Sequence, residues 1–128
     1  MDTSTVMQAR RFLYAFDHLK YDNMFDYDEA KRVIEMAKEK INPSLMIVFG
    51  SVANETAGDD SDLDLILVKE SDENRLIRSA KARLALEDSN IPIDIIVYTP
   101  EEFEKARGNK YSLVCEAMAT GRIVHGTV

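Results

Sequence analysis

Apolar residues recur along this chain at two different spacings, one typical of helices and one of strands. Near residues 4–19 they return every three or four positions, and the same spacing is found up to about residue 41. Asp26, followed three residues later by Glu29, resembles a cap that would start the second helix, and Asn42-Pro43 would end it. We therefore expect two helices before the first strand.

Short apolar runs predict the strands. Residues 45–49 are all apolar, which is typical of a strand buried on both faces. Residues 63–68 and 93–98 are also apolar, but each run is interrupted by a single aspartate. A small final strand is expected at 122–125.

The remaining helices are indicated by polar or proline residues at their expected first turns. They are a short helix from about Ser51, a helix over about 72–88 capped by Ser71, a helix that starts at 99–102 and ends at Gly108, and a helix over about 112–120 ended by Gly121. This order predicts an α/β class of the α+β type, with a small mixed β-sheet flanked by helices. We expect one domain over residues 1–128, with a core of about 28–125 and a helical extension at 1–27.

Composition narrows the expected partners and compartment. The 128 residues suffice for one hydrophobic core, and the net charge of −7, with a pI near 4.8, gives no electrostatic basis for binding nucleic acid. A small molecule or a protein is the expected partner. Cys115 is the only cysteine, no basic and apolar leader is apparent, and no apolar run approaches membrane-spanning length. We therefore expect a cytoplasmic protein with no membrane contact.

Three carboxylates in or beside apolar strands are the candidate chemistry. Asp62 and Asp64 are two residues apart and point to the same face of a strand, so a cation or a proton must relieve their repulsion. Asp94 joins them if its strand lies beside theirs. Three carboxylates on one sheet face suit Mg²⁺ or Mn²⁺.

Gly50-Ser51 lies between the first two predicted strands, ten residues before Asp62. Taken alone, it would be an ordinary turn. Together with the three aspartates it favours a phosphate site, because a glycine lets a phosphate oxygen approach the backbone and the serine can donate to it. The other polar candidates are expected to be loop or surface residues; they are Asp59, Asp60, His18 and His125.

Phe49-Gly50-Ser51, the ten-residue gap and the segment 61–65 resemble the defining motif of the minimal nucleotidyltransferases of the DNA polymerase beta superfamily. The segment 93–97 matches the position of that family's third acidic residue. The resemblance implies a polymerase-beta-like nucleotidyltransferase fold and transfer of a nucleoside monophosphate from an NTP, with AMP from ATP as the expected case. It also implies that Asp62, Asp64 and Asp94 are catalytic and bind Mg²⁺ or Mn²⁺, and that Gly50 and Ser51 bind nucleotide.

Many members of this family act as antitoxins that adenylylate a tyrosine of a helical HEPN-type toxin, so the resemblance implies such a partner. One departure is that Asn54 and Glu55 stand where the family often has Arg and Gly. The lost positive charge favours a non-catalytic antitoxin that neutralises its partner by contact, whereas the intact aspartates favour an enzyme. Transfer to a small molecule fits less well, because the chain has no obvious acceptor-binding domain. The helix near 4–19 either completes the core or forms a docking or self-association face. Assembly into a homo-oligomer is therefore a further alternative.

Overall fold

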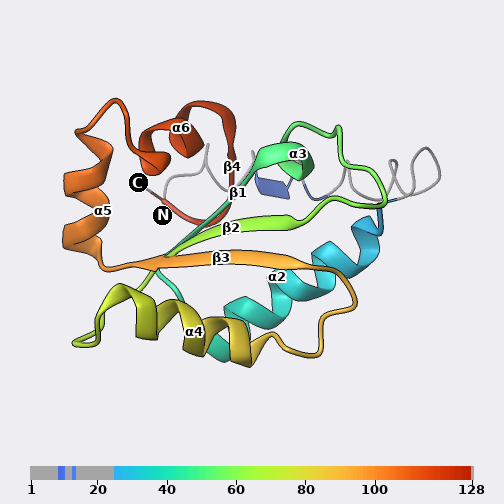
Figure 1. Cartoon of the computed structure of the whole chain (residues 1–128), viewed down its shortest axis with the longest axis horizontal. Helices are drawn as coiled ribbons and strands as arrows, with labels where there is room; N and C mark the ends of the chain where they lie inside the picture. The colour runs from blue at the N-terminus through green and yellow to red at the C-terminus, as the bar shows by residue number, and fades with distance from the viewer. Residues whose placement is uncertain (1–8, 11–12, 14–24, 128) are drawn as a thin grey trace.

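The computed structural model describes residues 9, 10, 13 and 25–127. The helix expected near 4–19 lies mostly outside these residues. Within 25–127 the elements are α2 (Tyr27–Ile41), β1 (Leu45–Phe49), α3 (Gly50–Ala53), β2 (Leu63–Val68), α4 (Arg75–Ala85), β3 (Ile93–Tyr98), α5 (Pro100–Arg107), α6 (Leu113–Thr120) and β4 (Arg122–Gly126) (Figure 1). The predicted α+β class and the four predicted strands are confirmed.

The four strands form one mixed sheet in the order β3-β2-β1-β4. β1 runs antiparallel to both of its neighbours, whereas β2 and β3 run parallel. Since parallel neighbours begin at the same edge of the sheet, the first residues of β2 and β3 lie side by side. The connection between them passes through α4, as parallel pairing requires a crossover.

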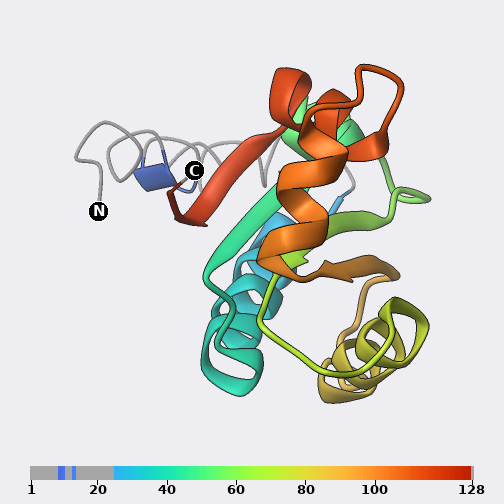
Figure 2. The same ribbon diagram turned by 90° about the vertical axis from the view of Figure 1, so that its left-hand side faces the viewer.

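Alternate residues of the strands pack against different helices, as the strand period of two dictates. The side chains of Leu63, Leu65 and Leu67 belong to a core that includes residues of α2 and α4. Ile66 and Val68 belong to a second core on the opposite face, with residues of α5 and α6. Figure 2 shows the sheet between these two layers of helices. None of the helices in the described part of the chain is long and apolar enough to cross a bilayer.

The cap of α2 is as predicted, since the Asp26 carboxylate accepts a hydrogen bond from the Glu29 backbone N–H at 2.9 Å. The prediction for α4 was wrong in its bounds and its cap. The helix spans Arg75–Ala85, and Asn74 caps it by accepting from the Ile77 N–H at 3.0 Å. Ser71 instead accepts from the Glu73 N–H in the preceding turn. Asn is as strong an N-cap as Ser, so the caps alone could not fix where this helix begins.

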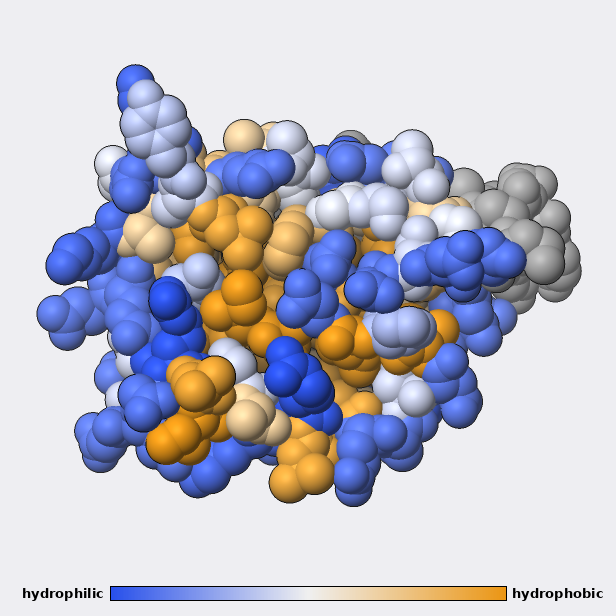
Figure 3. All heavy atoms as spheres, in the orientation of Figure 1, coloured by the Kyte–Doolittle hydropathy of each residue, from blue (hydrophilic) through white to orange (hydrophobic). Residues whose placement is uncertain are grey.

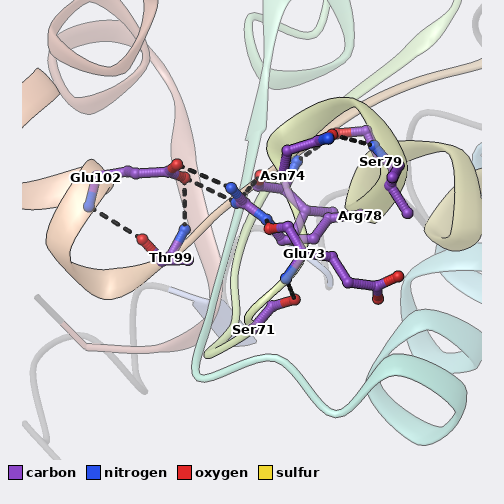
Figure 4. Close-up of polar contacts among 9 residues, drawn as sticks. Ser71, Glu73, Asn74, Arg78, Ser79, Thr99 and Glu102 are labelled. Atoms are coloured by element: carbon purple, nitrogen blue, oxygen red, sulfur yellow. Dashed lines mark hydrogen bonds and ion pairs between the residues drawn. The ribbon is translucent and has the colours of Figure 1, made fainter.

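Arg78 connects α4 to β3 and to α5 (Figure 4). This buried guanidinium donates to both carboxylate oxygens of Glu102, at 2.7 and 2.8 Å, and to the Val97 carbonyl at 2.7 Å. Glu102 also completes the predicted capping box with Thr99 at the start of α5. Next to Arg78, the Ser79 hydroxyl accepts from the Val97 N–H at 3.0 Å. α4 therefore satisfies polar groups on the outer edge of β3 with its own side chains.

We expect Glu102→Gln to weaken the fold most at neutral pH. Hydrogen bonds from Arg78 are the main cause that lowers the pKa of Glu102 to about 2. The resulting stability is present above the unfolded pKa of about 4.3 and is lost as the pH falls towards 2. Gln keeps the capping box but leaves Arg78 without its counter-charge. Because the Glu102 side chain is 42% exposed, we expect a loss of about 1–2 kcal/mol at pH 7, less than for a fully buried pair.

Urea unfolding at pH 7 and pH 3 measures this effect, with Glu104→Gln as the control on the same helix. Glu104 pairs with Arg107 at the surface, so its substitution should change stability little at either pH. A Glu102→Gln variant with the same pH dependence of unfolding as wild type would contradict the role of this ion pair.

Candidate active site

Sheet register brings the predicted aspartates together. Asp64 of β2 and Asp94 of β3 are directly paired in the parallel ladder. Both lie on the face that carries Ile66 and Tyr98 further along the strands, where α5 and α6 contribute to the core. At the beginning of the strands this face is more open, so Asp64 is only half-buried and Asp94 is exposed. The condition that the second and third strands be neighbours is therefore met.

The Gly-Ser turn reaches the same place through the antiparallel pairing of β1 with β2. Phe49, the last residue of β1, is paired with Asp64, and Gly50 follows it at once. Gly50 has a φ of +73°, in the left-handed region, and a Cβ added there would overlap the Asp64 Oδ2 atom. Only glycine allows this backbone to lie against the carboxylate. α3 starts here, one residue earlier than expected, and Ser51 lies half-buried within it.

Asp64 has a perturbed acidity. Burial is the main cause that raises the pKa of this carboxyl to about 6, and the charges of Asp94 and Asp62 raise it further. Asp62 is exposed and immediately precedes β2. Within residues 25–127, the carboxylates of these three aspartates form no hydrogen bond or ion pair with another side chain or with the backbone. No basic side chain in that range therefore offsets their repulsion.

The three aspartates fit a divalent cation in donor type and in charge. All their donors are hard oxygens, and the charges of Asp94 and Asp62 add to the effect of burial in raising the pKa of Asp64. The present arrangement of the side chains is not a closed metal site. Among the described residues, no group of three or more His, Cys, Asp or Glu is arranged so that it could hold a metal ion. The side chains would have to close around an ion, and the metal site stays a prediction.

Three further residues near the Gly-Ser turn lie outside the group of aspartates. Asn54 and Glu55 are exposed in the turn after α3, and Glu55 has a left-handed φ of 60°. Phe49 was given no role by the sequence, although its pairing fixes where Gly50 meets Asp64. The signal that could have found it is its position as the last apolar residue before the turn.

Comparison with known families decides what this site belongs to. Residues 30–118 match the model of a family described as the nucleotidyltransferase domain. The chain belongs to the nucleotidyltransferase domain family. The matched residues include the Gly-Ser turn and all three aspartates, so the family indicated by the sequence motif is confirmed.

Two solved structures resemble this nucleotidyltransferase domain. One, from Sulfolobus solfataricus, is described as a candidate nucleotidyltransferase; it is 21% identical, has a TM-score of 0.45, and the match covers 82% of each chain. The other is described as a toxin–antitoxin with AMP-PNP; it is 20% identical, has a TM-score of 0.49, and the match covers 76% of this chain and 73% of that one. A likeness of this degree says nothing about substrate or partner. No curated protein matches the chain significantly.

Proposed function

We propose that this nucleotidyltransferase domain is a metal-dependent enzyme that moves a nucleoside monophosphate, AMP from ATP, onto a hydroxyl acceptor, a tyrosine of a HEPN-type partner protein. The observation that carries the proposal is the direct pairing of Asp64 with Asp94 on an open sheet face beside Gly50. Family membership supports nucleotidyl transfer in general. ATP, the acceptor and the partner follow from the family resemblance of the motif.

The proposed roles of the site residues differ with their positions. Asp62, Asp64 and Asp94 would hold Mg²⁺ or Mn²⁺, which when bound offsets phosphate charge and stabilises the leaving pyrophosphate. Gly50 keeps the backbone open beside Asp64, and Ser51 would donate to the nucleotide phosphates. Asp94, the more exposed member of the pair, would accept a hydrogen bond from the acceptor hydroxyl.

Calorimetric titration with a nonhydrolysable ATP analogue and Mn²⁺ tests the binding roles. We expect Asp62→Asn to weaken binding by about tenfold or more, since it removes a charge from the metal site. Asp94→Asn should bind nearly as wild type but lose transfer by about 100-fold, the pattern of an interaction made chiefly in the transition state. Transfer is measured with α-labelled ATP and a HEPN-type protein supplied as the acceptor.

Asp59→Asn is the matched control, because Asp59 is an exposed loop carboxylate and its substitution removes the same charge. It should leave both binding and transfer unchanged. Equal analogue binding by wild type and Asp62→Asn would contradict the metal assignment, and full transfer by Asp94→Asn would contradict its role towards the acceptor.

The alternative function is that of a non-catalytic antitoxin that binds nucleotide and neutralises its partner by contact. It is favoured by Asn54 and Glu55, which leave the turn beside the site without a positive charge. The two functions separate in one experiment. If Asp94→Asn still neutralises the partner in cells as well as wild type does, contact is sufficient; if neutralisation is lost while the complex still forms, transfer is required.

A further inference from the structure

The orientation of α4 is inverted relative to an ordinary surface helix. It buries Arg78, Ser79 and Ala82. Its large apolar side chains point outward instead, with Leu76 82% exposed, Leu84 64% exposed and Ile77 also exposed. Surface helices usually bury their apolar face against the core. The inward polar residues are explained by the edge of β3, but no contact among residues 25–127 explains the outward apolar ones.

Beside this apolar stripe lies a shallow groove of about 490 Å³. The residues that line it belong to the C-terminal half of α4 and to the segment that leads into β3; they are Ala80, Arg83, Leu84, Leu86, Glu87, Ser89, Ile91 and Ile93. Figure 3 shows hydrophobic side chains over α4, in the lower part of this face, separated by strongly hydrophilic ones. The surface therefore has a projecting leucine, Leu76, near one end of the helix and a hollow near the other.

We propose that this surface joins two copies of the chain into a two-fold symmetric dimer, with α4 antiparallel to α4 of the second copy and the axis near Ala80. In a two-fold interface each contact occurs twice, with the partners exchanged. The antiparallel arrangement brings Leu76 of each copy to the groove at the far end of the other helix. The 11 residues of α4 span about 16 Å, so the two contacts are well separated and define one orientation.

Charge favours the same arrangement. Arg83 lies in the C-terminal half of α4, whereas Glu73, which also pairs with Lys81 of its own chain at 2.7 Å, immediately precedes the N-terminal cap. Antiparallel pairing about Ala80 places Arg83 opposite the first turn of the second helix, one turn from its Glu73. Parallel pairing would place Arg83 against Arg83. The helix dipoles also favour the antiparallel arrangement.

Sedimentation equilibrium of the full chain tests the dimer. We expect the wild type to be a dimer at micromolar concentration, and Leu76→Asp or Leu84→Asp to weaken it by at least about tenfold, as for loss of a buried apolar contact. Both positions are exposed, so circular dichroism should show an unchanged fold. Tyr111→Asp is the matched control, because Tyr111 is 86% exposed but lies in the segment between α5 and α6, and it should leave the dimer intact.

Cysteine cross-linking tests the orientation, in a background with Cys115→Ser. Mild oxidation of Ala80→Cys should join two chains, because residue 80 meets itself at the axis. Leu76→Cys should cross-link far less, because it faces residue 84 of the second copy. A monomeric wild type, a dimer that survives Leu76→Asp and Leu84→Asp, or cross-linking by Leu76→Cys in place of Ala80→Cys would each overturn the proposal. None of these results bears on the aspartates, so the proposal and the proposed function fail separately.

Discussion

Asp64→Asn should abolish nucleotidyl transfer and at the same time make the folded chain more stable at neutral pH. Loss of transfer by about 10³-fold or more is expected, because the variant removes a negatively charged carboxylate that is proposed to bind the metal ion. The gain in stability follows from the pKa of Asp64, which burial and the neighbouring carboxylates raise to about 6 in the folded chain. The usual value for Asp is about 3.9.

The sign follows from proton binding. Between pH 4 and 6 the folded chain holds a proton on Asp64 that the unfolded chain has released, so stability falls as the pH rises through this range. Above pH 6 the whole cost of the buried charge is present. Asparagine cannot ionise and therefore removes this cost. Thermal unfolding at pH 5 and pH 8 should show a larger increase in Tm for the variant at pH 8.

Asp59→Asn serves as the control for removing one charge from an acidic chain. It should raise Tm little, and equally at both pH values. A variant at position 64 that transfers nucleotide at the wild-type rate would contradict the proposed function. One that unfolds at a lower temperature than wild type at pH 8 would show that the carboxylate stabilises the fold, contrary to the raised pKa.

Gly50→Ala is expected to have the second largest effect. The left-handed φ of +73° costs a residue with a Cβ about 1–2 kcal/mol. The new methyl group would also overlap Asp64 Oδ2, so the carboxylate or the turn must move. We expect lower stability and a loss of transfer of about 100-fold, the scale expected for a small misplacement in a catalytic site.

Gly58→Ala is the matched control. Gly58 lies in the loop before β2, and a Cβ added there would meet nothing within 4 Å. Urea unfolding and transfer of labelled nucleotide are measured for both Gly50→Ala and Gly58→Ala. If Gly50→Ala lowers stability but retains transfer, the glycine serves the turn alone and the position of Asp64 beside it has no bearing on the reaction.

Local patterns sufficed to predict the strands and most of the caps. The apolar run at 45–49 is buried as expected of a central strand, and the Thr99 capping box appears as the residues predict. The site needed more than local pattern. Spacing could place Asp62 and Asp64 on one face, but the pairing of Asp64 with Asp94 depends on strand order and register. These are set by the α4 crossover and the whole core.

The orientation of α4 could not be predicted from the sequence. Its apolar residues recur at helical spacing, and that spacing predicts a stripe without saying which way the stripe faces. The choice is made by Arg78 and Ser79, whose partners on Val97 and Glu102 come from residues about 20 positions later in the chain. Polar contacts at a sheet edge therefore outweigh the burial of Leu76 and Leu84 in the single chain.

The Arg78–Glu102 contact affects how the two helical layers separate when the protein unfolds. α4 and α5 contribute to cores on opposite faces of the sheet, yet this ion pair joins them around the edge of β3. Neither helix can detach without leaving the other's charge unpaired. The contact therefore couples the two helical layers. The bonds that Arg78 and Ser79 make to the Val97 backbone also cover part of the outer edge of β3, which would otherwise be open to pairing with another chain.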